Sequence, residues 1–310
     1  MTGSNFYKYL FDFAHDNSAE VSTNPCGGEN GCTHPRGSCP SGQGNSQCYF
    51  KGSCCFNEIY YPEGRVKARC KYDCKKLVNQ YMWRSLDRYA SEIFYSLSQF
   101  ESTLRTYPDF NILSLGCGPA TELVAVEHFN NVNSLNKQIN YYGVDVEKTW
   151  NVIHEKIKEY VEADVHLNSF GGTYKDAINV LTSDKLNNKA FNLIILNYVI
   201  SSLIAAGDSG RIDTLFDSIA KLIIRNEIYN CIIIINEVND IRRGINSFMN
   251  LESILQNNNI NIFSLEQKYF ASRNVTPYGT SYTNSKTVFG HPRWLNNNCT
   301  SAQLLINCGV

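Results

Sequence analysis

Two glycines at the end of an apolar run constrain the fold of this chain more than any other feature of its sequence. Within NILSLGCGPATELVAVEHF (residues 111–129) the apolar run stops at Gly116-Cys117-Gly118-Pro119, and an amphipathic pattern begins at once. The two glycines allow a tight turn and leave the backbone free of side chains. Proline suits the first position of a helix, where an amide hydrogen would have no partner in any case. The pattern predicts a buried strand that turns directly into a helix.

After this turn, short apolar runs alternate with stretches of helical periodicity. The expected strands are Asn111–Leu115, Tyr141–Val146, Ala163–Leu167, Leu193–Tyr198 and Ile232–Glu237. The expected helices are Ala120–Phe129, Thr149–Tyr160, Tyr174–Leu186 and Arg211–Arg225. Strands that are apolar throughout are typical of a parallel sheet covered on both faces, and the alternation predicts a doubly wound, Rossmann-like α/β domain. We expect residues 261–270 and 285–294 to add an antiparallel strand pair at one edge.

Composition divides the chain into an N-terminal module, residues 1–74, and a larger domain, residues 75–310. Residues 22–52 are rich in Gly, Ser, Asn and Cys and nearly devoid of aliphatic side chains. Such a segment needs a metal, disulfides or a supporting surface to fold. In residues 75–104, apolar side chains recur at helical spacing, which predicts a long helix leading into the larger domain.

The cysteines concentrate in the N-terminal module. Eight of the 12 lie there, at Cys26, Cys32, Cys39, Cys48, Cys54, Cys55, Cys70 and Cys74. Disulfides fit a secreted scaffold, but the first residues lack the basic start and apolar core of an export signal. Eight thiols can instead hold about two structural zinc ions in an intracellular chain. We expect a zinc-stabilised substrate-recognition module and, since no apolar run reaches the length of a membrane helix, a soluble cytoplasmic protein.

A group of basic residues overlaps the end of this module. It comprises Arg65, Lys67, Arg69, Lys71, Lys75 and Lys76, with Tyr60, Tyr61 and Tyr72 interleaved. Basic side chains neutralise phosphates and aromatic rings stack on bases, so nucleic acid is a candidate partner. The alternative is a solvated helix face. The net charge of −1 confines any affinity for polyanions to such a local patch.

Polar side chains end two of the expected parallel strands. Asp145 closes the second strand, and Asn197 and Tyr198 close the fourth. Ligands of open α/β sheets bind beyond the carboxyl ends of the strands, so these residues and the glycine turn face one crevice. A carboxylate at the end of the second strand can accept hydrogen bonds from ribose hydroxyls.

This combination resembles the class I S-adenosylmethionine-dependent methyltransferases over roughly residues 111–237. The third glycine of a dinucleotide-binding G-x-G-x-x-G is Thr121 here, which counts against NAD or FAD. The resemblance implies a seven-stranded sheet with a reversed last strand. It also implies a set of cofactor-binding residues, namely Ser114, Gly116, Cys117, Gly118, Asp145, Asp164 and Asn197.

The resemblance assigns a place to the main members of this set. Gly116 and Gly118 face the methionine and ribose parts of the cofactor, and Asp145 binds the ribose hydroxyls. Asp164, or a neighbour within residues 162–167, lies near the adenine, and Asn197 lines the floor by the methyl group.

The chain departs from the family pattern at two positions. Ser114 stands where the family has an acid that anchors the methionine amine, and Ala120 stands where it has a third glycine. Glu122 is a nearby carboxylate that could compensate for Ser114, but we expect it to be an exposed acid at the start of the helix.

The expected reaction is in-line methyl transfer, in which placing the acceptor at near-contact distance supplies much of the acceleration. A catalytic triad is therefore not expected, and Asn197 and Tyr198 are the catalytic candidates by position. Nucleic acid is the first candidate acceptor, although the fourth strand lacks the Pro-Pro-aromatic motif of adenine amino methyltransferases and the cysteine of cytosine C5 enzymes. A protein or small-molecule acceptor is the alternative. A non-catalytic binding or regulatory module of the same fold is the third hypothesis.

Overall fold

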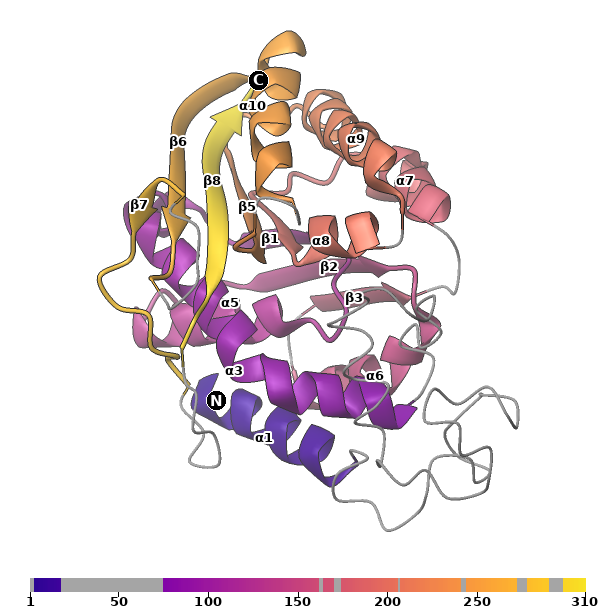
Figure 1. The fold of residues 1–310 in the computed structure, drawn as a ribbon, viewed down its shortest axis with the longest axis vertical. Helices are drawn as coiled ribbons and strands as arrows, with labels where there is room; N and C mark the ends of the chain where they lie inside the picture. Colours follow the sequence, from indigo (N-terminus) through magenta and orange to yellow (C-terminus); the bar gives the residue numbers. More distant parts are fainter. Residues whose placement is uncertain are drawn as a thin grey trace.

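The computed structural model describes residues 3–17, 75–161, 164–169, 174–205, 207–240, 244–271, 278–289 and 298–310. The strands are β1 (Phe110–Leu115), β2 (Ile139–Asp145), β3 (Asp164–Ser169), β4 (Leu193–Asn197), β5 (Cys231–Val238), β6 (Asn261–Tyr269), β7 (Thr280–Ser281) and β8 (Ser301–Gly309). They form a single sheet in the order β3-β2-β1-β4-β5-β8-β6-β7 (Figure 1). The first five strands in this order are parallel to one another, as expected.

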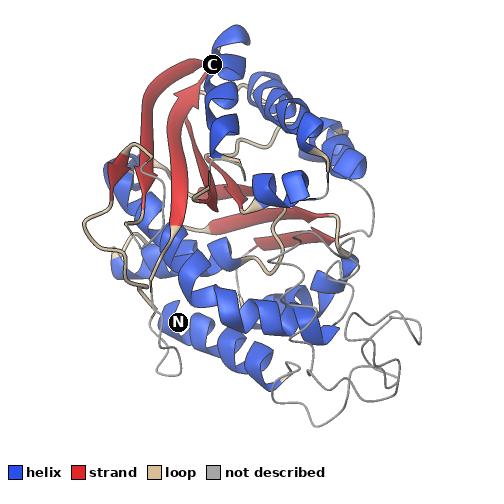
Figure 2. Ribbon diagram, in the orientation of Figure 1, coloured by secondary structure: helices blue, strands red, loops and turns tan. Residues whose placement is uncertain are grey.

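Helices cover both faces of this sheet (Figure 2). On one face lie α1 (Gly3–Asp16), α3 (Lys75–Gln99), α5 (Thr121–Val132) and α6 (Asn151–Tyr160). On the other face lie α7 (Tyr174–Thr182), α8 (Val199–Ala205), α9 (Ile212–Arg225) and α10 (Phe248–Asn257). The short α4 (Glu101–Thr106) lies between α3 and β1. This arrangement is the doubly wound α/β, Rossmann-like fold that the sequence predicts.

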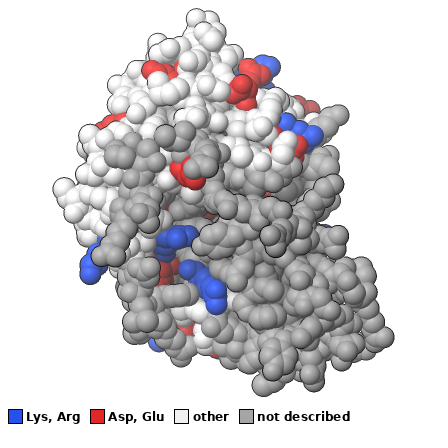
Figure 3. Space-filling model, in the orientation of Figure 1, with Lys and Arg blue, Asp and Glu red and all other residues white. Residues whose placement is uncertain are grey.

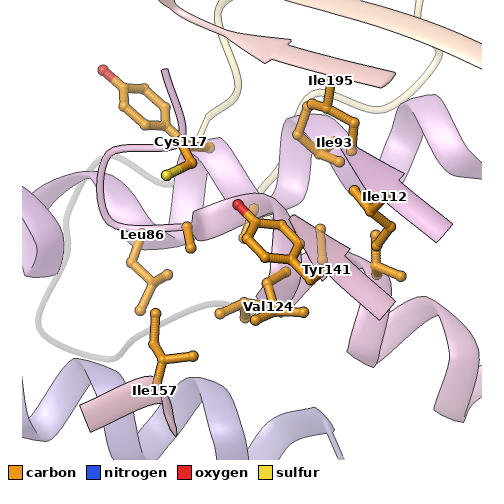
Figure 4. Packing of buried hydrophobic residues seen from close by; sticks show 14 of the residues in the cluster. Leu86, Ile93, Ile112, Cys117, Val124, Tyr141, Ile157 and Ile195 are labelled. Carbon is orange, nitrogen blue, oxygen red and sulfur yellow. The ribbon is translucent and has the colours of Figure 1, made fainter. Parts of the chain in front are cut away.

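Successive residues of the central strands enter two different cores. In β1, Ile112 belongs to the core beneath α3 and α5, whereas Leu113 belongs to the core beneath α9 and α10. Figure 4 shows the first core, where Ile93 of α3 and Val124 of α5 lie close to Ile112 and to Tyr141 of β2. Because both faces of each strand are buried, the strands are apolar throughout rather than alternating.

The antiparallel pair is formed by β6 and β8, so the expectation for residues 285–294 is wrong. β8 lies between β5 and β6 and is antiparallel to both. Residues 285–289 contribute one isolated bridge, from Lys286 to Asn298, and residues 290–294 lie outside the described part of the chain. β8 is favoured because its apolar residues Leu304 and Leu305 fill the two opposite cores.

The sheet has eight strands where seven were expected. The additional strand is β7, a two-residue segment that pairs in parallel with the outer edge of β6. β8 is the reversed strand that the family resemblance implies.

The first helix belongs to the larger body of the protein. Phe6 and Leu10 of α1 are fully buried in the same core as α3, and the hydroxyl of Tyr7 donates a hydrogen bond to Asp87 of α3. The boundary expected at residue 74 therefore does not hold for residues 3–16, while residues 18–74 lie outside the described part. The helix expected over residues 75–104 is α3 followed by α4. Among the described helices, none is long and apolar enough to cross a membrane.

Candidate functional site

The strand order creates a topological switch point between β1 and β4. β2 and β3 lie on one side of this point and β5 on the other, and open α/β sheets bind their ligands at the carboxyl edge of such a switch point. Gly116, in the loop after β1, is exposed and has a φ of 66°. A Cβ atom added to it would lie 2.7 Å from a methyl carbon of Val199, the first residue of α8. Both the backbone conformation and this close approach require glycine.

Asp145 joins the end of β2 to the glycine turn. Its carboxylate accepts a hydrogen bond from the backbone amide of Gly118 at 2.8 Å and another from the amide of Glu147 at 2.8 Å. The side chain is buried, and burial raises the pKa of Asp145 to about 6, against the lowering effect of these two amides. The structure thus brings together Asp145 and the glycine turn, as the sequence predicts.

The other side of Gly118 is held by α6 and the residue before it. The Nε2 atom of His154 lies 2.6 Å from the carbonyl oxygen of Gly118 and donates to it. Burial lowers the pKa of His154 to about 4, so the ring is neutral at pH 7. Trp150 is buried beside the turn, 3.7 Å from the position that a Cβ of Gly118 would occupy. Gly118 is therefore fixed through both its amide and its carbonyl.

Glu122 is buried rather than exposed, which corrects the expectation for this residue. Only 1% of its surface is accessible, and its Oε1 atom accepts hydrogen bonds from the hydroxyl of Ser114 at 2.5 Å and from that of Tyr141. The hydroxyl of Thr121 lies 3.4 Å from its other oxygen. Burial raises the pKa of Glu122. A buried carboxylate from the first turn of α5 thus lies next to Ser114.

The position of the third family glycine is strained in this chain. Ala120 precedes α5 with a φ of 55°, in the left-handed region. This conformation costs residues other than glycine about 1–2 kcal/mol. The helix begins at Thr121, so Pro119 lies before the helix instead of at its first position.

A row of polar side chains crosses the sheet on the face covered by α3. Asn197 of β4 is directly opposite Asn236 of β5, which is directly opposite Gln303 of β8. Asn236 donates to the amide oxygen of Asn197 at 2.8 Å and accepts from the amide of Gln303 at 2.8 Å. Asn197 in turn donates to the hydroxyl of Thr121 at 3.1 Å. Asn197 therefore connects this row to the first turn of α5.

Glu92 of α3 lies at the other end of this row and is fully buried. Its Oε2 atom accepts hydrogen bonds from the hydroxyl of Tyr198 at 2.8 Å and from the amide of Asn236 at 3.0 Å. Its Oε1 atom accepts from the backbone amides of Thr300 at 2.9 Å and Ser301 at 3.3 Å. All four partners are donors, and a carboxylate is the side chain that accepts on every side.

Two further residues of the predicted cofactor site are Cys117 and Asp164. Cys117, predicted to be a cofactor-binding residue, has a buried side chain, and burial raises its pKa well above the ordinary value. Asp164 begins β3 opposite Asn140, whereas Ser169 lies opposite Asp145. Asp164 therefore lies near the amino end of β3, and its place near the adenine stays a prediction.

The predicted metal and nucleic-acid residues fall almost entirely on the undescribed segment. The eight cysteines from Cys26 to Cys74 and the basic residues Arg65 to Lys71 lie outside the described residues, and Lys75 and Lys76 begin α3. Within the described ranges, no cluster of His, Cys, Asp or Glu has a metal-binding arrangement.

Sequence reasoning missed three buried polar residues, namely Glu92, Gln303 and Glu237. Glu237 follows Asn236 in β5, is fully buried, and accepts a hydrogen bond from the backbone amide of Ser201 in α8 at 3.0 Å. Burial raises the pKa of Glu237 to about 7. The available signal was the polar pair Asn236-Glu237 at the end of an apolar strand. Glu92 carried no such local signal.

The sheet order, with a reversed strand next to β5, is the arrangement that the resemblance implies. The fold is of the Rossmann-like methyltransferase type. No protein-family model matches the sequence, and no curated protein matches it.

Searches of solved structures find methyltransferases. A SAM-dependent methyltransferase from Aquifex aeolicus is 11% identical, with 75% of this chain and 97% of that chain covered and a TM-score of 0.43. One from Archaeoglobus fulgidus is 14% identical, with 73% and 99% covered and a TM-score of 0.40. Magnesium protoporphyrin IX methyltransferase from Synechocystis, solved with bound SAH, is 11% identical, with 84% and 97% covered and a TM-score of 0.40. At these identities and scores, the matches say nothing about what this chain binds.

Proposed function

We propose that this chain is an S-adenosylmethionine-dependent methyltransferase. The observation that carries the proposal is the contact between the Asp145 carboxylate and the Gly118 amide at 2.8 Å, beside the exposed Gly116 at the switch point of the sheet. The end of β2 and the turn after β1 meet there at one edge of the sheet.

The residues at this edge fit an adenosyl sulfonium. Each Asp145 oxygen accepts a hydrogen bond from one backbone amide. Each oxygen keeps a further lone pair, to which a ribose hydroxyl can donate. Gly116 exposes its backbone where a side chain would intrude. Glu122 supplies the carboxylate that the family places at position 114.

Bound S-adenosylmethionine supplies a methyl group that its sulfonium charge already activates. The protein contributes position, because an in-line reaction depends on holding the acceptor at near-contact distance. Asn197 serves as a positioning residue, since its amide bonds to Thr121 and Asn236. Tyr198 follows it at the carboxyl edge of the sheet and is the candidate to contact the reacting groups.

Calorimetric titration with S-adenosylmethionine tests this proposal. The wild type is expected to bind, and Asp145→Ala is expected to bind about a hundredfold more weakly, because two hydrogen bonds to a charged acceptor are lost. Asp184→Ala is the matched control, since Asp184 is an exposed aspartate whose carboxylate bonds to Asn187. A wild-type protein that does not bind the cofactor would refute the proposal.

We propose nucleic acid as the acceptor, with a protein or small molecule as the alternative. The basic group between Arg65 and Lys76 supports this choice. Arg84 and Arg88 of α3 are partly exposed, and Figure 3 shows Lys and Arg side chains near the middle of the drawn face. A methyl-transfer screen with labelled cofactor against total RNA, DNA and protein decides between these acceptors. Label found only in protein would overturn the choice of nucleic acid.

We also propose that the N-terminal cysteines hold zinc. Elemental analysis of the purified protein is expected to find about two zinc ions per chain. Replacing Cys70 and Cys74 by Ser is expected to remove zinc and to lower stability. A metal-free protein of unchanged stability would contradict this proposal.

A further inference from the structure

Tyr198 has a backbone conformation that bulky residues rarely adopt. Its φ is 59°, and left-handed conformations of this kind persist only where the surroundings fix them, often at functional sites. Its backbone amide donates to the carbonyl oxygen of Asn236 at 2.7 Å. Its hydroxyl donates to Glu92 at 2.8 Å. The residue is thus held at both ends.

The ring of Tyr198 is held in a stack as well. It lies against the ring of Tyr89 with centroids 4.1 Å apart and an interplanar angle of 29°. Tyr198 is only partly buried, although its hydroxyl is anchored inside the protein. The following residue, Val199, touches the glycine turn at Gly116. An anchored aromatic ring therefore belongs to the residue next to the contact between the glycine turn and the start of α8.

We propose that Tyr198, held in place by Glu92, recognises the sulfonium group of the cofactor and so favours S-adenosylmethionine over S-adenosylhomocysteine. This inference rests on the proposed function. The two ligands differ by one methyl group and one positive charge at sulfur. An aromatic ring attracts a cation placed over its face, and it has no such attraction for a neutral thioether.

Two charged side chains of α3, Arg88 and Glu92, lie near the Tyr198 and Tyr89 rings. Arg88 lies one turn before Glu92 on α3, with its guanidinium carbon 4.8 Å from the centre of the Tyr89 ring. Burial, and then the nearby Glu92 carboxylate, raise the pKa of Tyr198, so the phenol is neutral at pH 7. Glu92 holds the ring through its hydrogen bond to the Tyr198 hydroxyl, so it acts as a positioning residue for the ring.

Calorimetry with both ligands tests the inference without any knowledge of the acceptor. Tyr198→Leu is expected to weaken S-adenosylmethionine binding by roughly two- to thirtyfold, the range of a cation–π contact, and to leave S-adenosylhomocysteine binding unchanged. Glu92→Gln is expected to show a smaller loss of the same kind. Tyr198 is partly exposed, so its variant remains informative if the variant of the buried Glu92 fails to fold.

Tyr95→Phe is the matched control, because it removes a tyrosine hydroxyl from α3 that bonds to the carbonyl oxygen of Lys286. It is expected to change neither affinity. Equal weakening of both ligands by Tyr198→Leu, or no weakening of either, would overturn the inference and leave the proposed function standing. If the wild type binds neither ligand, the proposed function itself fails.

Discussion

Two buried carboxylates lie at opposite ends of the polar row, and they are built differently. Glu122, 1% exposed, accepts from the side-chain hydroxyls of three other residues, Ser114, Tyr141 and Thr121. Glu92, fully buried, accepts from two backbone amides of the segment leading into β8, from one side-chain amide and from one hydroxyl. Hydroxyls can rotate and reverse their role, whereas backbone amides cannot.

This difference indicates separate tasks for the two ends. Glu122 lies beneath the glycine turn and supports the region that Asp145 shares with the proposed cofactor. Glu92 joins α3 to β4, β5 and β8, and it also fixes Tyr198. The hydrogen bonds of Glu122 join residues close to one loop, the glycine turn. The Glu92 end holds distant parts of the chain together at the same edge of the sheet.

The largest expected effect is the loss of stability in Glu92→Ala. This change leaves two backbone amides and the Asn236 amide without their acceptor, which costs about 3–5 kcal/mol of unfolding free energy. Glu122→Ala is expected to cost less, because its three hydroxyl partners can find other acceptors. Urea denaturation measures both, with Ser98→Ala of α3 as the control, since its hydroxyl bonds only within the helix. Equal losses at the two carboxylates would contradict the comparison.

Glutamine substitutions sharpen the same contrast. At position 92, the new amide group must face a donor, either the backbone amides or Asn236, so Glu92→Gln is expected to cost about 2 kcal/mol. At position 122, the amide can donate to Thr121 while the oxygen accepts from Ser114 and Tyr141. Glu122→Gln is therefore expected to cost less than about 1 kcal/mol. The comparison fails if denaturation ranks the two variants in the reverse order.

A further expected effect is a pH dependence of cofactor binding through Asp145, which lies at the Glu122 end. Burial raises the pKa of Asp145 from 3.8 to about 6, and only the ionised carboxylate accepts two ribose hydroxyls. Cofactor affinity is therefore expected to fall by about tenfold per pH unit below pH 6. Because the folded pKa exceeds the unfolded one, Asp145 stabilises the free protein below about pH 4 and loses this contribution as the pH rises to 6.

Titrations of cofactor binding between pH 5 and 8, by calorimetry, measure this dependence. Asp145→Asn is the control, since it keeps the size of the side chain and removes its titration. An affinity that stays constant over this range in the wild type would show that the Asp145 charge has no part in binding.

The sequence predicts the Glu122 end far better than the Glu92 end, and the reason is distance along the chain. The glycine turn and Asp145 lie within one β-α-β unit, so local periodicity and turn chemistry place them correctly. The hydrogen bonds of Glu92 reach Tyr198, 106 residues away, and Ser301, 209 residues away. No local pattern on α3 distinguishes this glutamate from a solvated one.

Two errors of detail have similar causes. Acidic side chains are favourable near the start of a helix, and this led to the expectation that Glu122 is exposed. The sequence does not show that tertiary packing buries the first turn of α5. β8 was missed because its pairing partners, β5 and β6, are set by the topology of the whole sheet. Local sequence shows that a segment such as β8 can form a strand. Which of several such segments joins the sheet depends on how its side chains pack in the core.

The structure of the protein bound to S-adenosylhomocysteine tests the central claim most directly. We predict that the ligand lies over Gly116 at the switch point between β1 and β4, with its ribose hydroxyls within hydrogen-bonding distance of the Asp145 carboxylate. A ligand bound elsewhere, or one whose ribose is out of reach of Asp145, would contradict the account.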